Sequence, residues 1–230
     1  MKKVGFVGGI GPASTVDYYL GFISRSQKKF GEKAYPEFCI DNVNMDKMIG
    51  SINDGRYEDT ADYLAASVSC LKACGAEIAA ITANTPHIAW NYMKDKFEIP
   101  VISIVDAAVN EMKRRGFKRV VVMGTVFTMK SGLYEMPMKA AGIEPVIPSD
   151  EDKEKIGSLI YPNLENGIII PEDKKELQEI AQKYADSFKA DAVLLGCTEL
   201  PMVIGEGDLS VPVLNTTQIH LDVVFEEACK

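Results

Sequence analysis

Short apolar runs that stop abruptly at glycine or small polar residues recur along the chain. Ile78–Ile81 stops at the polar cluster 82–87, and Ala192–Leu195 stops at residues 196–199. Buried strands with this ending are typical of open parallel α/β sheets, which present ligands at the carboxyl edge of the sheet. The two stretches therefore predict two strand ends that bind a ligand.

The two stretches belong to an internal repeat. Glu77 aligns with Asp191 and Ala83 aligns with Cys197, at the same offset of 114 residues and without a gap. One strand end therefore carries a thiol where the other carries a methyl group.

Periodicity extends the repeat over the whole chain. The expected strands are Lys3–Val7, Pro36–Val43, Ile78–Ile81, Ile99–Ile104, a run from Lys118, Glu144–Ile147, Ala192–Leu195 and Val211–Leu214. The expected helices are one capped by Ser14 or Thr15, Tyr57–Cys74, His87–Phe97, Val105–Arg115, Ser131–Ala141, one opened by Ser149, Lys174–Phe188 and Thr216–Ala228. The pattern predicts two pseudo-symmetric, doubly wound α/β domains with mainly parallel sheets and an active site in the interdomain cleft. We expect residues 1–98 plus 215–230 to form the N-terminal domain and residues 99–214 to form the C-terminal domain.

A glycine loop, residues 8–12, follows the first strand and precedes a helix. It lacks the third glycine of a dinucleotide fingerprint and the Lys-Ser/Thr ending of a P-loop. A helix start after such a loop favours an anion of carboxylate size, bound by Gly9, Ile10 and Gly11. A purely structural turn is the alternative.

Composition excludes several kinds of partner. The net charge of −8 does not favour nucleic acid or an anionic membrane surface. No apolar stretch reaches the roughly 18 residues of a membrane helix. The five cysteines are an odd number without framework spacing, which predicts reduced thiols and a cytoplasmic location. Cys70 and Cys74 lie four residues apart without a second pair, so we expect them to pack in the core and not to bind metal.

Two equivalent strand ends suit racemisation, in which one group removes a proton from one face of a tetrahedral carbon and another returns a proton to the opposite face. Both groups act as acid and as base, and a thiol with a pKa near 8.5 suits that task. Asn84, Thr85 and Thr125 can hold a carboxylate and stabilise an enolate-like intermediate. Thr198 can donate to a thiolate at Cys197.

The chain resembles the cofactor-independent aspartate/glutamate racemase family, and its aspartate racemase branch in particular, through residues 8–12, 84–87 and 196–199. The resemblance implies two pseudo-symmetric domains, a homodimer, a small amino-acid substrate, and neither pyridoxal phosphate nor metal. It places the acid–base thiol at Cys197 and the missing partner at Ala83. The expected substrate-binding residues are Gly9, Ile10, Gly11, Lys47, Asn84, Thr85, His87, Thr125, Thr128, Thr198 and Glu199.

Some of these assignments have structural alternatives. His87 either contacts substrate or packs against Trp90, and Thr125 and Thr128 either donate to a carboxylate or cap a helix. For the side-chain carboxylate of the substrate, the family uses basic residues in two segments. Here Lys47 lies in the first segment, but Glu165 lies near the second, which puts simple aspartate specificity in doubt.

The chain departs from the family at position 83, where the family has Cys or Thr before Asn-Thr. Ala83 cannot exchange a proton, and Thr82 points to the other face of the strand. Ala83 is either a substitution that traps substrate in a racemase or the natural residue of a one-cysteine relative. A one-cysteine relative points to a decarboxylase, and an amino-acid or dicarboxylate binding protein without turnover is a further alternative.

Overall fold

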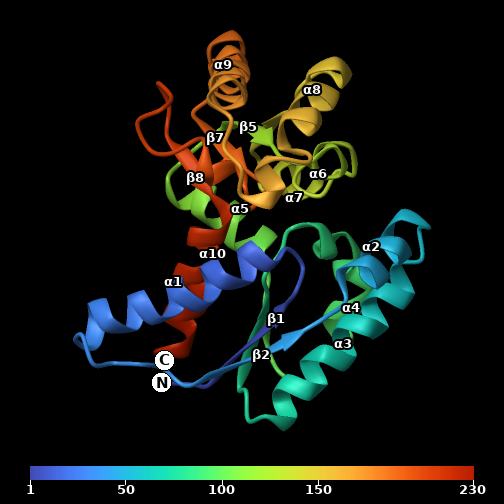
Figure 1. Cartoon of the computed structure of the whole chain (residues 1–230), viewed down its shortest axis with the longest axis vertical. Coiled ribbons are helices and arrows are strands. Elements are labelled where there is room, and N and C mark those ends of the chain that lie inside the picture. Colours follow the sequence, from blue (N-terminus) through green and yellow to red (C-terminus); the bar gives the residue numbers. More distant parts are fainter. The chain divides into compact units, whose positions relative to one another are not determined.

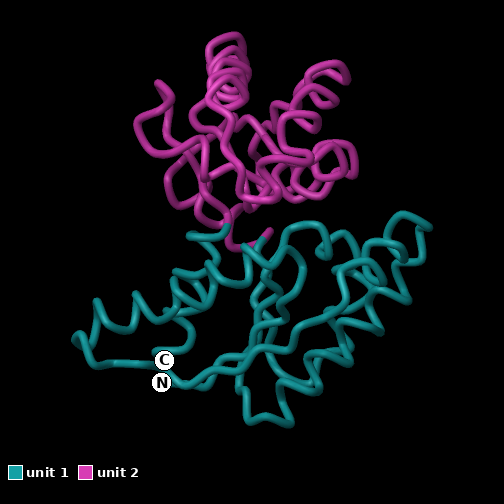
Figure 2. Tube along the Cα trace, viewed as in Figure 1, with its two compact units in different colours: residues 1–104, 217–230 teal, residues 105–216 magenta.

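The structure, a computed structural model, describes residues 1–230. The chain forms two compact units, unit 1 with residues 1–104 and 217–230, and unit 2 with residues 105–216 (Figure 2). Each unit contains a four-stranded parallel sheet with helices packed on it (Figure 1). The expected α/β fold class is thereby confirmed, while the expected domain boundaries stay a prediction about which segments fold independently.

Unit 1 has the strand order β2-β1-β3-β4, with every neighbouring pair parallel. Its strands are β1 (Val4–Gly8), β2 (Phe38–Asn42), β3 (Ile78–Ile81) and β4 (Val101–Ile102). Its helices are α1 (Pro12–Phe30), α2 (Met45–Asn53), α3 (Tyr57–Ala73), α4 (Trp90–Met93) between the 3₁₀ turns η1 (Thr85–Ala89) and η2 (Lys94–Lys96), and the final α10 (Thr216–Ala228). The helix α5 (Ile104–Arg114) leads into unit 2.

The core of unit 1 follows from the alternation of side chains along its strands. Val4 and Phe6 of β1 point to the face covered by α1 and α10, where Phe6 stacks edge-on against Tyr18 and Phe22. On the opposite face, a Cβ at Gly5 would lie 2.8 Å from Cβ of Leu71, so a glycine is needed for α3 to pack this closely. Both faces of the sheet are thus buried, as continuous apolar strands require.

A buried histidine joins the elements of unit 1. His220 of α10 is fully buried; its Nε2 donates to the carbonyl of Ile102, and its Nδ1 accepts from the hydroxyl of Tyr18 at 2.6 Å. Burial lowers the pKa of His220 to about 3, so the ring is neutral at ordinary pH. Its hydrogen bonds give it a structural role in unit 1.

Unit 2 repeats the topology of unit 1, with the strand order β6-β5-β7-β8 and parallel pairing throughout. Its strands are β5 (Arg119–Met123), β6 (Glu144–Val146), β7 (Ala192–Leu195) and β8 (Val213–Asn215). Its other helices are α6 (Val126–Lys130), α7 (Glu135–Ala140), α8 (Asp150–Ile160), α9 (Pro171–Phe188) and the 3₁₀ turns η3 (Leu164–Asn166) and η4 (Leu200–Met202). The element order thus supports the internal repeat read from the sequence.

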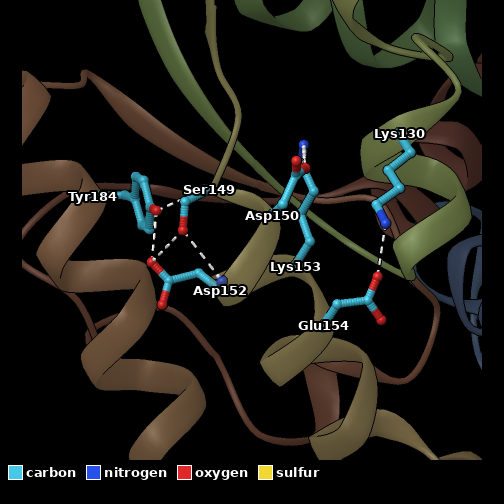
Figure 3. A network of polar contacts seen from close by, with 7 residues as sticks. All are labelled: Lys130, Ser149, Asp150, Asp152, Lys153, Glu154 and Tyr184. Atoms are coloured by element: carbon cyan, nitrogen blue, oxygen red, sulfur yellow. Dashed lines mark hydrogen bonds and ion pairs between the residues drawn. The ribbon is translucent and has the colours of Figure 1, made fainter.

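The core of unit 2 lies between the sheet and the helices α8 and α9. Val121 and Val193 point to this face and pack with Ile156 of α8 and Leu177 of α9. Ser149 caps α8 by accepting a hydrogen bond from the amide of Asp152, as its place before a charged helix predicts. Tyr184 of α9 donates to the carboxylate of Asp152 at 2.6 Å, which ties α8 to α9 (Figure 3).

Several predicted elements need correction. The expected helix Ser131–Ala141 is shorter than predicted, because α7 begins only at Glu135 and Gly132, with φ +77°, lies in the turn between α6 and α7. The helix α1 begins at Pro12 after Gly11, so Ser14 and Thr15 do not cap it. The expected helix His87–Phe97 is three short pieces, and the expected strand Ile99–Ile104 shrinks to the two residues of β4.

The cysteine assignment also needs correction. Cys70 and Cys74 are exposed on and just after α3, so neither packs in the core. The apolar side of α3 is formed by Leu64, Val68 and Leu71, and the two cysteines lie outside this stripe. No helix of the chain is both long enough and apolar enough to cross a membrane.

Candidate active site

Positions 83 and 197 occupy the same place in the two sheets. Each comes two residues after the last paired residue of its strand, Ile81 in β3 and Leu195 in β7. Both side chains are buried, with Ala83 6% exposed and Cys197 5% exposed. Because neighbouring parallel strands end at the same edge, each position lies at the edge where β1 or β5 also ends.

Cys197 has a carboxylate as its hydrogen-bond partner. Its Sγ donates to Oε2 of Glu199 at 2.9 Å, and the hydroxyl of Thr198 donates to Oε1 of the same carboxylate at 2.8 Å. Glu199 is itself only 9% exposed. A buried carboxylate normally has hydrogen-bond donors, and here the thiol and the hydroxyl are two of them.

The surroundings of Cys197 hold it in the thiol form. Burial raises the pKa of the Cys197 thiol well above its ordinary value, and the negative charge of Glu199 and its hydrogen bond raise it further. Hydrogen bonds from the backbone N–H groups of Glu199 and Leu200 act in the opposite direction and favour a thiolate. The site therefore contains both a proton acceptor for the thiol and donors for the sulfur anion.

The start of α6 positions the turn that carries Cys197. Thr125 caps α6 by accepting from the amide of Thr128, and the two hydroxyl groups lie 3.1 Å apart. The Thr128 hydroxyl also donates to the carbonyl of Gly196 at 3.5 Å. Both threonines therefore have the capping and supporting roles that were the alternative to binding a carboxylate, and Thr125 remains half-buried.

A matching support exists at position 83. The hydroxyl of Ser14, in the first turn of α1, donates to the carbonyl of Thr82 at 2.5 Å. Thr82 is fully buried, and its own hydroxyl donates to the carbonyl of Val7 at 3.0 Å. Thr82 therefore points into the protein, as strand alternation predicts, and its hydroxyl is occupied.

His87 is built into the turn that carries Ala83. The ring is 3% exposed and stacks on Trp90 with 5.4 Å between ring centroids. Its Nδ1 donates to the carbonyl of Ala83 at 3.0 Å, and its Nε2 accepts from the amide of Ile104 at 3.4 Å. Burial lowers the pKa of His87 to about 4, which keeps the ring neutral. With both ring nitrogens bonded to backbone, this geometry favours a positioning role over the expected contact with substrate.

The glycine loop is held by Thr15. The amide of Gly9 donates to the Thr15 hydroxyl at 2.9 Å, so this N–H is not available to a substrate. The amides of Ile10 and Gly11 are bonded to no other group of the chain. Of the three expected loop residues, Ile10 and Gly11 therefore keep free donors.

The other expected residues of unit 1 lie after β2 and β3. Asn84 is buried and precedes η1, and Thr85 is half-buried at its start. Lys47 is exposed on α2, with its Nζ 4.3 Å from the ring centroid of Tyr63. Its ammonium therefore has a cation–π contact inside unit 1.

Tyr161 and Glu165 form a pair that sequence reasoning did not identify. The hydroxyl of Tyr161 donates to Oε1 of Glu165 at 2.6 Å. This bond, with burial and the charges of Glu165 and Glu199, raises the pKa of Tyr161 to about 12. Tyr161 thus lies within electrostatic reach of Glu199, the hydrogen-bond partner of the thiol. A spacing of four residues can indicate a side-chain contact on a helix. No regular helix joins Tyr161 to Glu165, so helical periodicity could not predict this pair.

No group of three or more His, Cys, Asp or Glu side chains is placed to hold a metal ion. The titratable partner of Cys197 is Glu199, and Tyr161 is bonded to Glu165, all within unit 2.

Comparison with known proteins adds to this geometry. The chain is 35% identical to an aspartate racemase homologue from Pyrococcus horikoshii, with a TM-score of 0.90 and 100% of both chains covered. It is 27% identical to a protein from Yersinia pestis described as a candidate Asp/Glu racemase, with a TM-score of 0.92 and 100% of both chains covered. The broad specificity amino-acid racemase RacX of Bacillus subtilis is 24% identical over 229 residues, which covers 93% of this chain and 92% of RacX.

The sequence profile of the Asp/Glu/Hydantoin racemase family matches residues 7–224, which include both strand-end motifs and most of both compact units. The chain therefore belongs to the Asp/Glu/Hydantoin racemase family.

Proposed function

We propose that the chain acts on the Cα proton of an amino acid as a racemase of the aspartate/glutamate type, with Cys197 as its acid–base group. One observation carries the proposal: a buried thiol at the end of β7 donates its hydrogen to the carboxylate of Glu199 at 2.9 Å. Membership of a racemase family supports the same chemistry.

The chemistry at Cys197 needs two proton transfers. The thiol proton moves to the Glu199 carboxylate, and amide N–H groups stabilise the thiolate that forms. The thiolate then takes the Cα proton, and the electron pair of the Cα–H bond moves toward the substrate carboxylate as an enediolate-like anion. Return of the proton from Cys197 restores the starting enantiomer.

Racemisation also requires a proton on the opposite face of the carbon. Position 83 is the repeat equivalent of position 197, and Ala83 has no group that exchanges protons. The two-base reaction is therefore incomplete in this chain, and we expect proton exchange on one face. An engineered substitution and a natural one-cysteine protein both fit this expectation.

The substrate carboxylate needs hydrogen-bond donors. The free amides of Ile10 and Gly11 are candidates because they follow β1 at the carboxyl edge of its sheet. Asn84, Thr85, Thr125 and Thr198 are further candidates, and Lys47 is the candidate for an anionic side chain. The proposed reaction uses neither a cofactor nor a metal, and we propose that the protein is cytoplasmic. We also propose that it is a homodimer, which sedimentation equilibrium can test by measuring the mass of the particle in solution.

Ala83→Cys tests the proposal. We expect this variant to interconvert the enantiomers of at least one amino acid in a panel that includes aspartate and glutamate, whereas Ala83→Ser, a matched control of similar size, does not. If Ala83→Cys is inert on every amino acid while the unchanged chain releases CO₂ from a malonate, the one-cysteine decarboxylase is the correct function. Binding of an amino acid without any Cα exchange in either protein indicates a binding protein.

A further inference from the structure

Three of the five cysteines lie at the edge of the unit 1 sheet where its strands begin. Cys39 is the second residue of β2, and Cys70 and Cys74 lie in the last turn of α3 and directly after it. Position 83, in contrast, follows the opposite end of β3. The three thiols are therefore outside the candidate active site, and the proposed function uses none of them.

The packing of α3 on the sheet brings its last turn over Cys39. Gly5 is the partner of Cys39 in the register of β1 and β2, and a Cβ at Gly5 would lie 2.8 Å from Cβ of Leu71. On the same face, the Sγ of Cys39 lies 3.9 Å from the carbonyl oxygen of Leu71. Leu71 precedes Cys74 by three residues. The half-buried thiol of Cys39 thus lies beside the end of α3 that carries the exposed thiol of Cys74.

Lys3 lies beside both cysteines. Its Nζ donates to the carbonyl of Cys74 at 2.7 Å, and the next residue, Val4, has its carbonyl oxygen 3.9 Å from the Sγ of Cys39. Burial raises the pKa of the Cys39 thiol and the charge of a Cys74 thiolate raises it further, whereas the Lys3 ammonium lowers it. The two sulfur groups therefore lie within electrostatic reach of each other, and burial favours the thiol form of Cys39.

Cys70 is a poorer partner for Cys74. The amide of Cys74 still donates to the carbonyl of Cys70 at 3.0 Å, so helical spacing extends to Cys74. Residues four apart on a helix have Cβ atoms about 5–6 Å apart, whereas a disulfide needs about 3.5–4.5 Å. Cys39 approaches the same turn from another element, so this helical spacing does not constrain it.

We propose that Cys39 and Cys74 are a thiol pair that hydrogen peroxide converts reversibly into an intramolecular disulfide. The Cys74 thiolate attacks one peroxide oxygen, the O–O bond breaks, and a sulfenic acid and hydroxide form. The Cys39 thiol then attacks the sulfenic sulfur, the S–S bond forms, and the sulfenic oxygen leaves as water with the Cys39 proton. The two thiols are oxidised by two electrons and the peroxide is reduced.

A cellular thiol reductant reverses such a bond, as is usual for disulfides that form transiently in a reducing compartment. The inference does not depend on the proposed function, because it concerns neither Cys197 nor position 83.

Peptide mapping of the full chain after treatment with hydrogen peroxide tests the proposal. The remaining thiols are blocked with iodoacetamide, and trypsin then places Cys39 in peptide 34–47 and Cys74 in peptide 73–94, since cleavage after Lys72 separates Cys74 from Cys70. We expect mass spectrometry to find these two peptides joined in the treated protein and released by dithiothreitol. Cys39→Ser and Cys74→Ser should each abolish the linkage, and the matched control Cys70→Ser should keep it.

The alternative products are distinguishable. A link from Cys74 to Cys70, a link between two chains on a non-reducing gel, or full alkylation of Cys39 after the treatment overturns the assignment. A joined pair whose yield is unchanged when the protein is diluted supports it, because dilution suppresses only links between chains. Cys74 is exposed, so Cys74→Ser retains the fold and keeps the test decisive if Cys39→Ser does not fold.

Discussion

The Sγ of Cys197 lies 2.9 Å from Oε2 of Glu199, and both side chains are buried. The proton acceptor for the thiol is therefore two residues away on the same turn of unit 2. We expect Glu199→Gln to lower the pKa of Cys197, because the substitution removes a buried negative charge and leaves an amide that can donate to the sulfur.

Peptide-resolved iodoacetamide labelling between pH 6 and 10 measures this pKa shift at Cys197, separately from the four other thiols. Glu179→Gln is the control for loss of a carboxylate elsewhere in unit 2. An unchanged labelling profile in Glu199→Gln would show that the carboxylate does not govern the thiol.

Neutral His87 makes the protein sensitive to acid. The unfolded chain binds a proton at His87 with a pKa near 6.5, and the folded chain binds it only near 4. The folded state therefore binds fewer protons, so the stabilisation is complete above about pH 6.5 and is lost as the pH falls toward 4. The loss is at most about 3 kcal/mol.

Urea unfolding at pH 7, 6, 5 and 4 measures this dependence. We expect a smaller slope of unfolding free energy against pH for His87→Asn, which cannot titrate and whose amide can still donate to the carbonyl of Ala83. Carboxylates titrate in both proteins, so the difference in slope isolates His87. Equal slopes of unfolding free energy against pH in the unchanged chain and in His87→Asn would mean that the His87 ring is not buried in its neutral form.

Gly9 has two reasons to be glycine. Its φ is +83°, and a Cβ there would lie 2.5 Å from the carbonyl oxygen of Val43. At Gly31, where φ is +103° and no atom lies within 4 Å of the Cβ position, only the backbone conformation favours glycine. We expect Gly31→Ala to cost about 1–3 kcal/mol of unfolding free energy and Gly9→Ala to cost more. Equal costs by denaturant titration would show that the loop can move away from Val43.

Ser67 carries a buried hydroxyl without a hydrogen-bond partner on α3. Ser67→Ala removes this group and inserts a better helix former, so we expect the unfolding free energy to rise by about 1 kcal/mol. Ser69→Ala on the same helix is the control, because the Ser69 hydroxyl donates to Glu98 at 3.2 Å. A rise of equal size in both variants would point to helix propensity alone.

Much of the fold follows from local patterns. The buried strands β3 and β7 have the expected bounds because four apolar residues end at a polar turn, and α10 has the expected bounds from Thr216 to Ala228. The order of strands in each sheet also agrees with the repeat. These features depend on burial and periodicity, which a single sequence displays.

The departures occur where tertiary contacts override local preference. Thr125 caps α6 shortly after β5, so a helix begins at Val126 where unit 1 has the glycine loop of residues 8–11. Gly132 then breaks the chain before α7. Within the candidate site, the expected contact of Glu199 with substrate stays a prediction, and the structure adds that Glu199 is the hydrogen-bond partner of Cys197. The sequence indicates this pairing only by an acidic residue two positions after a cysteine. The pairing itself depends on the burial of both side chains, which the sequence pattern does not display.

The stereochemistry of Cα–H exchange in D₂O is the most direct test of Cys197 as a one-sided acid–base group. We expect the unchanged chain to incorporate deuterium into one enantiomer of its substrate with retention of configuration, and Cys197→Ser to incorporate none. Deuterium in both enantiomers with inversion in the unchanged chain, or undiminished exchange in Cys197→Ser, would contradict this assignment.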